Sequence, residues 1–190
     1  MITPILNTTR LVLRPLRATD EARLQALFPH YEVLKYMNAA IPWPYPDDGA
    51  THFIESALAG MAREERFVWA IVEKAAGDDL LIGCIDLFPT KTDDNRGFWL
   101  GLPYQGKGYM TEAVAAVTDF AFDVVRLPRL VLNNAEPNLA SHRLKEKAGA
   151  MILEINEAVH CVGGVFRQIR WIHTPEQWHA NRNRFLNSSA

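Results

Sequence analysis

The segment GFWLGLPYQGKGYMTE, residues 97–112, carries the most chemical information in the chain. A strand-like run ends near Leu102, a turn with Gly106 and Gly108 follows, and a helix with periodic apolar residues begins. The first amides of a helix have no intrahelical partner and lie in a positive potential, so this turn suits a phosphate or pyrophosphate group. Lys107 adds a positive charge. A plain strand-to-helix turn without a ligand is the alternative.

Two kinds of phosphate-binding turn compete for this segment. Gly101, Gly106 and Lys107 have the spacing of the P-loop of nucleotide triphosphatases, but Gly108 stands where that loop needs a Ser or Thr hydroxyl for Mg²⁺. P-loops also belong to parallel sheets, whereas the strands before this turn are predicted to form an antiparallel meander. The P-loop is therefore the disfavoured alternative.

The second kind of turn contains Gln105-x-x-Gly108, a signature of the coenzyme A pyrophosphate turn in the GNAT superfamily of N-acetyltransferases. It lies within a longer series of motifs. These are TTRLVLRPLRATD (8–20), IPWPYP (41–46), LLIGCIDL (80–87), GFWLGLPYQGKGYMTEAV (97–114) and PNLASHRLKEKAGA (137–150). In this order they resemble the Rim-type ribosomal-protein N-acetyltransferases of that superfamily, over roughly residues 8–172.

The resemblance implies that acetyl-CoA enters a V-shaped gap between two central parallel strands, here residues 97–102 and 129–134. Backbone groups around residues 100–102 would pair with the pantetheine arm, and the next amides would surround the pyrophosphate. The implied cofactor-binding residues of this part are Leu100, Gly101, Leu102, Gln105, Gly106, Lys107, Gly108, Tyr109, Met110 and Thr111. Met110 departs from the family, which usually has Gly or Ala there, and its side chain is expected to narrow the pocket.

Asn138 and Ser141 match the family's N-x-x-S helix start. This implies that Asn138 contacts the cofactor arm and that Ser141 lies near the cofactor sulfur. The chemistry agrees, because a departing thiolate with a pKa near ~8.5 needs a hydrogen-bond donor more than a strong acid, and a hydroxyl suffices. The alternative is a serine that bonds only to the helix backbone.

The general base is less clearly marked. Many superfamily members carry a glutamate just before the strand that begins at Gly97, but Arg96 occupies that place. Rim-type enzymes can use a glutamate on the strand after the N-x-x-S helix, and His160 is the matching residue here. Histidine titrates near neutrality and suits proton transfer. Asp86 is the second candidate, and purely structural roles for both residues are the alternatives.

Trp43 and Tyr45 are expected to form a wall of the acceptor site, because the proline-rich loop holds them at little entropic cost. The alternative is that they cap the core. Cys84 and Cys161 are predicted to be small core residues, and adjacent strand residues point to opposite faces, which argues against His160 and Cys161 as a base and nucleophile. We expect neither a disulfide framework nor a metal site.

The hydrophobic pattern predicts the elements that position these residues. Predicted strands cover residues 10–17, 67–73, 80–88, 97–102, 129–134, 151–160 and 165–172, and predicted helices begin near residues 20 and 50 and cover 108–126, 139–148 and 175–185. Pro15 is expected to mark the first strand as an edge. The fold class is α/β (α+β), a mixed and mostly antiparallel sheet flanked by helices. One domain is expected over residues 1–190, with a core of about 8–174 and a terminal helix of about 175–186.

The composition fits this interpretation. The chain has 190 residues, a formal net charge of −2 and 48% apolar residues, which disfavours disorder and coiled coil. The near-zero charge does not support a nucleic-acid-binding surface, and no apolar run reaches membrane-span length. The two cysteines each lie in an apolar run, so we expect a cytoplasmic protein. Its oligomeric state, monomer or homodimer, is left open by the sequence.

Together these observations predict an N-acetyltransferase that moves the acetyl group of acetyl-CoA directly to a primary amine. A protein N-terminal α-amine is the first choice of acceptor. A small amine, such as a polyamine, an amino acid or an antibiotic, is the alternative acceptor. A non-catalytic acyl-CoA-binding module is the alternative outside the enzyme class.

Overall fold

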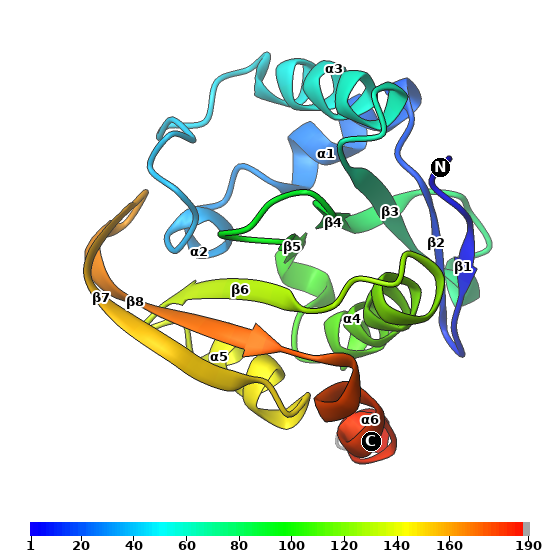
Figure 1. Ribbon diagram of the computed structural model, residues 1–190. Helices are drawn as coiled ribbons and strands as arrows, with labels where there is room; N and C mark the ends of the chain where they lie inside the picture. Colours follow the sequence, from blue (N-terminus) through cyan, green and yellow to red (C-terminus); the bar gives the residue numbers. More distant parts are fainter. Residues whose placement is uncertain (188–190) are drawn as a thin grey trace.

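The computed structural model describes residues 1–187 and divides the strands between two sheets (Figure 1). The larger sheet has, in spatial order, β1 (Leu6–Asn7), β2 (Leu11–Pro15), β3 (Phe67–Glu73), β4 (Leu81–Leu87) and β5 (Arg96–Leu100). The smaller sheet has β6 (Leu130–Ala135), β8 (Gly164–His173) and β7 (Met151–Cys161). Every ladder in them is antiparallel, which confirms the predicted predominance of antiparallel pairing.

The helices lie close to the predicted segments. They are α1 (Glu21–Leu27), α2 (Tyr31–Leu34), α3 (Gly49–Ala62), α4 (Tyr109–Asp119), α5 (Leu139–Lys147) and α6 (Pro175–Asn187). Short 3-10 turns cover Ala18–Asp20, Lys74–Ala76 and Leu102–Tyr104, and α4 continues into a π-helical turn, Phe120–Val124. Trp178 of α6 is fully buried, and its Nε1 donates to Oδ1 of Asp119 at 2.8 Å, so α6 closes the core beneath α4.

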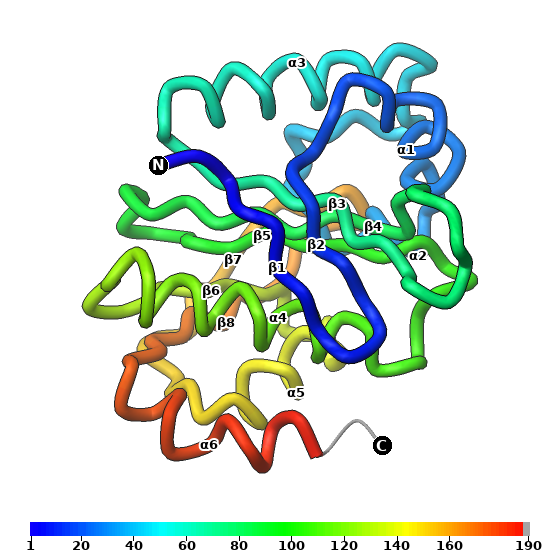
Figure 2. The backbone as a smooth tube through the Cα atoms, turned by 90° about the vertical axis from the view of Figure 1, so that its right-hand side faces the viewer, coloured from blue at the N-terminus to red at the C-terminus, as the bar shows by residue number. Residues whose placement is uncertain are grey.

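Helices cover both faces of the larger sheet, as Figure 2 shows with α1 and α3 on one side and α4 on the other. Phe67, Trp69 and Ile71 of β3 pack into the core that contains α4. Val68 and Ala70 alternate with them and pack against α1 and α3. A strand buried on both faces reads as a continuous apolar run, which explains the sequence FVWAIV.

Asn95 joins the two sheets at the start of β5. Its backbone N–H donates to the carbonyl of Val131 at 2.8 Å, and its Oδ1 accepts from the N–H of Val131 at 2.7 Å. Its Nδ2 donates to the carbonyls of Phe88 and Lys91. Beyond this junction β5 pairs with β4 and β6 pairs with β8, so the two strands separate.

One prediction about the sheet is wrong. β2 is not an edge strand, because β1 pairs with it through Leu6 opposite Leu13 and Asn7 opposite Val12. β1 is only two residues long, too short to produce a periodic signal. It ends before the level of Pro15, whose missing N–H therefore costs no ladder hydrogen bond on that side.

Candidate active site

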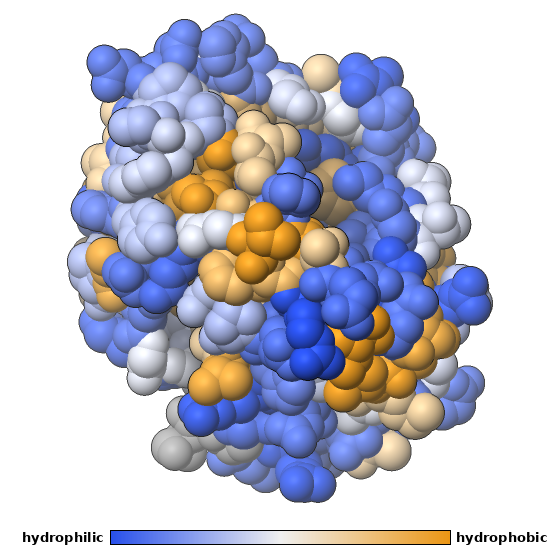
Figure 3. All heavy atoms as spheres, turned by 90° about the vertical axis from the view of Figure 1, so that its left-hand side faces the viewer, coloured by the Kyte–Doolittle hydropathy of each residue, from blue (hydrophilic) through white to orange (hydrophobic). Residues whose placement is uncertain are grey.

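A cavity of about 1480 Å³ opens where β5 and β6 separate. Its walls are residues 98–100 of β5, residues 133–135 of β6, the first turns of α4 and α5, and the loop between α2 and α3. Figure 3 views the side of α2 and the β7–β8 hairpin and shows apolar side chains gathered there among polar ones. Pockets for drug-sized ligands measure roughly 300–1,000 Å³, so this cavity has room for two reactants.

The glycine turn before α4 has the geometry that an anion needs. Gly106 and Gly108 have positive φ of 74° and 77°, and an added β-carbon at Gly106 would meet only open space, so conformation rather than crowding requires glycine there. The helical hydrogen bonds of α4 begin with Glu112 N–H to Gly108 O at 3.2 Å, which leaves the preceding first-turn amides as donors. The Nε2 of Gln105 donates to Leu100 O at 2.8 Å and closes the turn.

The N-terminal segment anchors this turn, a role that the sequence analysis missed. The backbone N–H of Arg10 donates to Glu112 at 2.6 Å, its Nε donates to the same carboxylate at 2.8 Å, and its Nη1 donates to Lys107 O at 2.9 Å. Burial raises the pKa of Glu112, but hydrogen bonds from Arg10 and Thr8 outweigh this effect and hold the pKa below its ordinary value. The only sequence signal for this contact was that Thr8 and Arg10 lie in a motif shared with the family.

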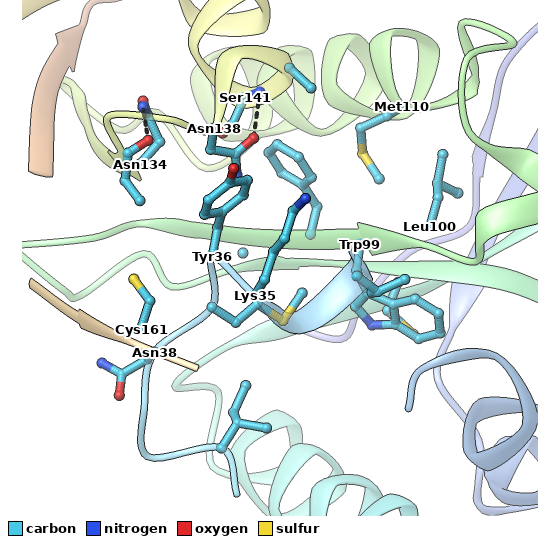
Figure 4. Close-up of a pocket in the computed structure, with 18 of the residues that line it drawn as sticks. Lys35, Tyr36, Asn38, Trp99, Leu100, Met110, Asn134, Asn138, Ser141 and Cys161 are labelled. Atoms are coloured by element: carbon cyan, nitrogen blue, oxygen red, sulfur yellow. Dashed lines mark hydrogen bonds between the residues drawn. The ribbon is translucent and has the colours of Figure 1, made fainter. Parts of the chain in front are cut away.

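Met110 lies where the resemblance led us to expect it. It is the second residue of α4, lines the cavity and packs partly against the main core (Figure 4). Its side chain therefore occupies space beside the turn that a Gly or Ala would leave open.

Ser141 and Asn138 meet at the start of α5, on the cavity wall. The Oδ1 of Asn138 accepts from the N–H of Ser141 at 3.2 Å and caps the helix (Figure 4). The Ser141 side chain does more than bond to its own helix backbone, because its Oγ accepts from Nζ of Lys145 at 2.6 Å. Sequence reasoning did not single out Lys145, since a charged residue on a helix is normally solvated.

Asp86 is a buried carboxylate on β4 that lines the same cavity. It forms an ion pair with Arg66, which is itself largely buried. Burial raises the pKa of Asp86 to about 6, against the opposing charge and hydrogen bond of Arg66. A carboxyl group poised near neutrality in a cleft is a candidate for proton transfer. The structure therefore brings Asp86, Ser141 and the glycine turn to one cavity.

The structure does not bring His160 to this cavity. His160 is exposed on β7, and its neighbours Val159 and Cys161 line the cavity instead. Successive side chains of a strand point to opposite faces, so the imidazole of His160 points away. Only the backbone carbonyl of His160 contributes here, by accepting from the N–H of Ala39 at 3.0 Å.

Only one of the two aromatic residues that were expected to form the acceptor wall lines the cavity. Tyr45 is half-buried, lines the cavity and packs edge-on against Phe28, with the ring centroids 5.1 Å apart. Trp43 is 45% exposed and packs against Tyr31 at 5.6 Å, outside the group of residues that lines the cavity.

Other features bear on the remaining expectations. Cys84 and Cys161 are buried and free, as predicted. Within residues 1–187, no three His, Cys, Asp or Glu side chains gather as ligands for a metal ion. No helix in that same range has the length and apolarity to cross a membrane.

The comparison with protein families decides between the phosphate-binding alternatives. Residues 10–151 match the family model of the acetyltransferase (GNAT) domain. The chain belongs to the GNAT acetyltransferase family. For a GNAT protein, acetyl-CoA is the ligand to test against the turn before α4, and the P-loop alternative loses its support.

Curated relatives of this GNAT domain carry general names. The "Probable N-acetyltransferase YjcK" of Bacillus subtilis is 34% identical over 109 residues, which are 55% of this chain and 59% of YjcK. The match thus spans less than two thirds of that relative. The "Uncharacterized N-acetyltransferase YnaD" of the same organism is 25% identical over 76% of this chain and 81% of its own length.

Solved structures share the GNAT fold over nearly the whole chain. RimJ of Mycobacterium smegmatis, in complex with a coenzyme A disulfide, has a TM-score of 0.83 at 15% identity, over 98% of this chain and 95% of its own. The ribosomal-protein acetyltransferase RimL, in complex with coenzyme A, has a TM-score of 0.75 at 16% identity, over 90% of this chain and 98% of its own. At these identities the likeness establishes the fold.

Proposed function

We propose that this protein transfers the acetyl group of acetyl-CoA directly to a protein N-terminal α-amine. The observation that carries the proposal is the cavity between β5 and β6, which has the glycine turn at its rim and Asp86 and Ser141 in its walls. In direct transfer, the amine nitrogen bonds to the thioester carbonyl carbon, the carbon–sulfur bond breaks, and the amine proton leaves with a base. In this scheme the glycine turn binds acetyl-CoA, Asp86 accepts the amine proton and Ser141 stabilises the departing sulfur.

The cavity residues fit acetyl-CoA as the first substrate. The amides from Gly106 to Thr111 would surround the pyrophosphate, with Lys107 adding charge, because these donors precede the hydrogen-bonded body of α4, whereas the N–H of Gln105 already donates to Leu102 O at 3.2 Å. Backbone groups of residues 100–102 would pair with the pantetheine arm between the separated strands. Asn138 would contact the same arm from the opposite wall.

Asp86 is our choice for the general base, acting directly or through one water molecule. A peptide α-amine has a pKa of about 7.7–8.0, so roughly a tenth is already neutral at pH 7, whereas a lysine amine near 10.4 is almost wholly charged. The raised pKa of Asp86, about 6, lies closer to the pKa of the amine, and most of the carboxyl group is still ionised at pH 7. His160 does not suit this role because its side chain points away from the cavity.

Ser141 is our choice for the group that stabilises the departing thiolate. It is 8% exposed, lines the cavity and carries a hydroxyl on the first turn of α5. A hydrogen-bond donor that already points to the place where negative charge develops lowers the activation barrier more than a donor that must first give up its hydrogen bonds to water.

The acceptor side favours an extended peptide over a compact small amine. The cavity continues from the β5–β6 gap along the loop between α2 and α3, where Tyr45 and Ile41 give an apolar wall and Glu32 adds a carboxylate. This elongated cavity suits the N-terminus of a peptide chain, whose first side chains would contact the cavity walls. Support from relatives comes from RimJ and RimL, of which RimL is named as a ribosomal-protein α-N-acetyltransferase.

The test is thiol release from acetyl-CoA with a matched acceptor panel. One peptide carries a free N-terminus and no lysine, its partner has a blocked N-terminus and one lysine, and a polyamine and an aminoglycoside represent small amines. We expect turnover with the first peptide and little with the second. Turnover with the small amines alone would move the acceptor to that class.

Thermal unfolding with acetyl-CoA or Mg-ATP is the accompanying binding measurement. A ligand present at about 100 times its Kd stabilises the native state by about 2.7 kcal/mol, which raises the melting temperature measurably. We expect this shift with acetyl-CoA and none with Mg-ATP. Tight acetyl-CoA binding without turnover on any amine would instead identify a non-catalytic acyl-CoA-binding module.

A further inference from the structure

Behind Ser141 lies a lysine that the mechanism above does not use. Lys145 follows Ser141 by one turn of α5 and is only 2% exposed. Its Nζ donates to Ser141 Oγ at 2.6 Å and approaches the Ser141 carbonyl at 3.4 Å. Lysine is rarely buried without a carboxylate partner, because its charge is strongly hydrated in water. The position of Lys145 therefore calls for an explanation.

The charged groups that face Lys145 come from the first residue of β5 and from the loop before it. They are Arg96, whose Nη1 donates to Thr118 at 2.9 Å, and Asp94. Burial is the main cause that lowers the pKa of Lys145 to about 7, Arg96 lowers it further, and Asp94 opposes both. Lys145 thus changes its charge near neutrality rather than near the ordinary value of about 10.4.

His173 of β8 borders the same cluster and stays neutral. Its Nε2 lies 3.0 Å from the carbonyl of Ala148, and burial, followed by the charge of Arg96, lowers its pKa to about 4. Among residues 1–187, the buried side-chain atoms without a hydrogen-bond partner include Asp94 Oδ1, Arg96 Nε and His173 Nδ1. This cluster is therefore not arranged for the best internal pairing.

The hydrogen bond between Lys145 and Ser141 has a direction. An ammonium group can only donate, so Ser141 Oγ accepts from Lys145 and its own hydrogen is left for an acceptor elsewhere. Ser141 lines the cavity and Lys145 does not. The order of groups from the interior outward is thus Lys145 Nζ, Ser141 Oγ and the cavity, where the thioester sulfur would lie.

We propose that Lys145 is a positioning residue that directs the hydroxyl hydrogen of Ser141 toward the leaving sulfur and replaces the proton that Ser141 gives up. This inference rests on the proposed acetyl transfer and deepens it. As the carbon–sulfur bond breaks, the thiolate takes the hydroxyl proton of Ser141, and Ser141 Oγ takes a proton from the Lys145 ammonium. After coenzyme A leaves, water in the open cavity returns a proton to Lys145 through Ser141.

The transfer runs downhill. A lysine that holds its proton with a pKa of about 7 is a stronger acid than a thiol near ~8.5, so the proton moves from Lys145 to the sulfur with favourable free energy. Before the proton moves, the ammonium also stabilises the developing thiolate through Ser141, because it holds the hydroxyl hydrogen of Ser141 toward the sulfur.

If the role of Lys145 were purely structural, Lys145→Met would keep the wild-type kcat. We expect the variant to fold, because replacing a buried charge with an apolar residue of similar shape is often neutral or stabilising, and its melting temperature should be at or above that of the wild type. Under our proposal the same variant loses about ten- to a hundredfold in kcat at about pH 6.5, with an unchanged Kd for acetyl-CoA. Arg184→Met, which removes an exposed cation of α6 that does not line the cavity, is the control and should keep the wild-type kcat.

The pH profile and a double variant provide sharper readouts. Lys145 carries its proton below its pKa, so the ratio of wild-type kcat to Lys145→Met kcat should be large at about pH 6.5 and decline toward about pH 9. The ionisation of the acceptor amine affects both proteins and cancels in this ratio. Ser141→Ala and Ser141→Ala/Lys145→Met should agree within about twofold, because Lys145 acts only through Ser141.

A measurement without an acceptor separates this inference from the proposed function. The pKa of the bound coenzyme A thiol, followed by ultraviolet thiolate absorbance against desulfo-coenzyme A, should be lower in wild type than in Lys145→Met. If that difference is found but no amine is acetylated, the acetyl transfer fails while the role of Lys145 toward the sulfur stands. If peptides are acetylated but the thiol pKa and the kcat ratio do not depend on Lys145, our inference is overturned.

Two further outcomes are decisive. An acetyl group trapped on Ser141 after rapid quenching would show that Lys145 removes the serine proton, which overturns the proposed direction of transfer. If Lys145→Met does not fold, NMR titration of the Lys145 ammonium in wild type replaces it. We then expect its pKa to rise when coenzyme A binds at a pH where its thiol is ionised, compared with desulfo-coenzyme A, and an equal pKa in both complexes would contradict the proposal.

Discussion

The two walls of the cavity are built in different ways. The wall proposed for the cofactor comes from two continuous stretches, residues 97–112 and 137–150, each a strand or loop that leads into a helix. The wall proposed for the acceptor combines the α2–α3 loop, Asp86 of β4 and the end of β7. Local sequence determines the first wall, whereas the second exists only when segments far apart in the chain meet.

Backbone hydrogen bonds hold the second wall together. The segment after α2 contacts the β7–β8 hairpin through Ala39 N–H to His160 O, Val162 N–H to Met37 O at 2.9 Å and Gly163 N–H to Lys35 O at 2.8 Å. Asn38 and Cys161 also form an isolated bridge. The acceptor wall therefore depends on where the hairpin lies, whereas Arg10 and Glu112 hold the turn before α4.

The largest expected effect comes from Asn95, which joins β5 to β6 beside the cavity. Asn95→Ala removes three side-chain hydrogen bonds, to Val131, Phe88 and Lys91, and leaves buried groups unpaired at the junction of β5 and β6. We expect a loss of about 3 kcal/mol in the free energy of unfolding, measured by urea denaturation. Asn156→Ala, which removes one long hydrogen bond of 3.3 Å on β7, is the control and should cost under about 1 kcal/mol. Equal losses for both variants would contradict the role of Asn95 as the junction.

The second effect tests the acceptor wall. Asp86→Asn keeps the shape of the side chain but cannot accept a proton, so kcat/KM for the peptide should fall by about a hundredfold while the Kd for acetyl-CoA stays the same. Wild-type kcat/KM should rise with pH through about 6 as Asp86 loses its proton, and this limb should vanish in the variant. Asp78→Asn, an exposed carboxylate on the far turn, should behave as wild type. Retention of the limb in Asp86→Asn would remove Asp86 from the mechanism.

The same substitution makes a prediction about stability. The folded-state pKa of Asp86 lies above the unfolded value of 3.8, so the folded protein binds more protons between pH 3.8 and about 6. The contribution of Asp86 to stability is therefore present at low pH and is lost as the pH rises through about 6. We expect the stability of wild type relative to Asp86→Asn to decrease over this interval, which chemical denaturation at several pH values measures.

The contrast between the walls also explains what the sequence could reveal. The glycine turn, the capped start of α5 and nearly every strand follow from local patterns, because each needs only its own residues to form. Lys145 and Arg66 were missed because the importance of a cation depends on what surrounds it, and their surroundings come from β5 and β4. His160 was selected because it matches a glutamate position of the family, but irregular pairing in β7 between Asn156 and Val159 makes such a match a poor guide to the face that a residue occupies.

A pair of glutamine variants sharpens the comparison at a smaller effect size. Gln105→Ala removes the hydrogen bond to Leu100 O that closes the glycine turn, and should raise the KM for acetyl-CoA about fivefold without changing the KM for the peptide. Gln25→Ala removes the hydrogen bonds to Pro46 O and from Ala50 N–H that hold the other loop. It should raise the peptide KM instead. If both variants changed the same KM, the division of the cavity into two walls would be wrong.

The smallest expected effect concerns the exposed end of the acceptor wall. Trp43 contacts Tyr31 outside the residues that line the cavity, so Trp43→Ala should change the peptide KM by no more than about twofold and the stability by under about 0.5 kcal/mol. Tyr45 lines the cavity and also packs edge-on against Phe28, so Tyr45→Ala should have the greater effect on both quantities. Peptide kinetics and denaturation of the two variants check the order. A larger effect from Trp43 on the peptide KM would mean that the acceptor extends past the cavity onto the outer surface of the loop. Only such a ligand can contact the Trp43 ring, because Trp43 does not line the cavity.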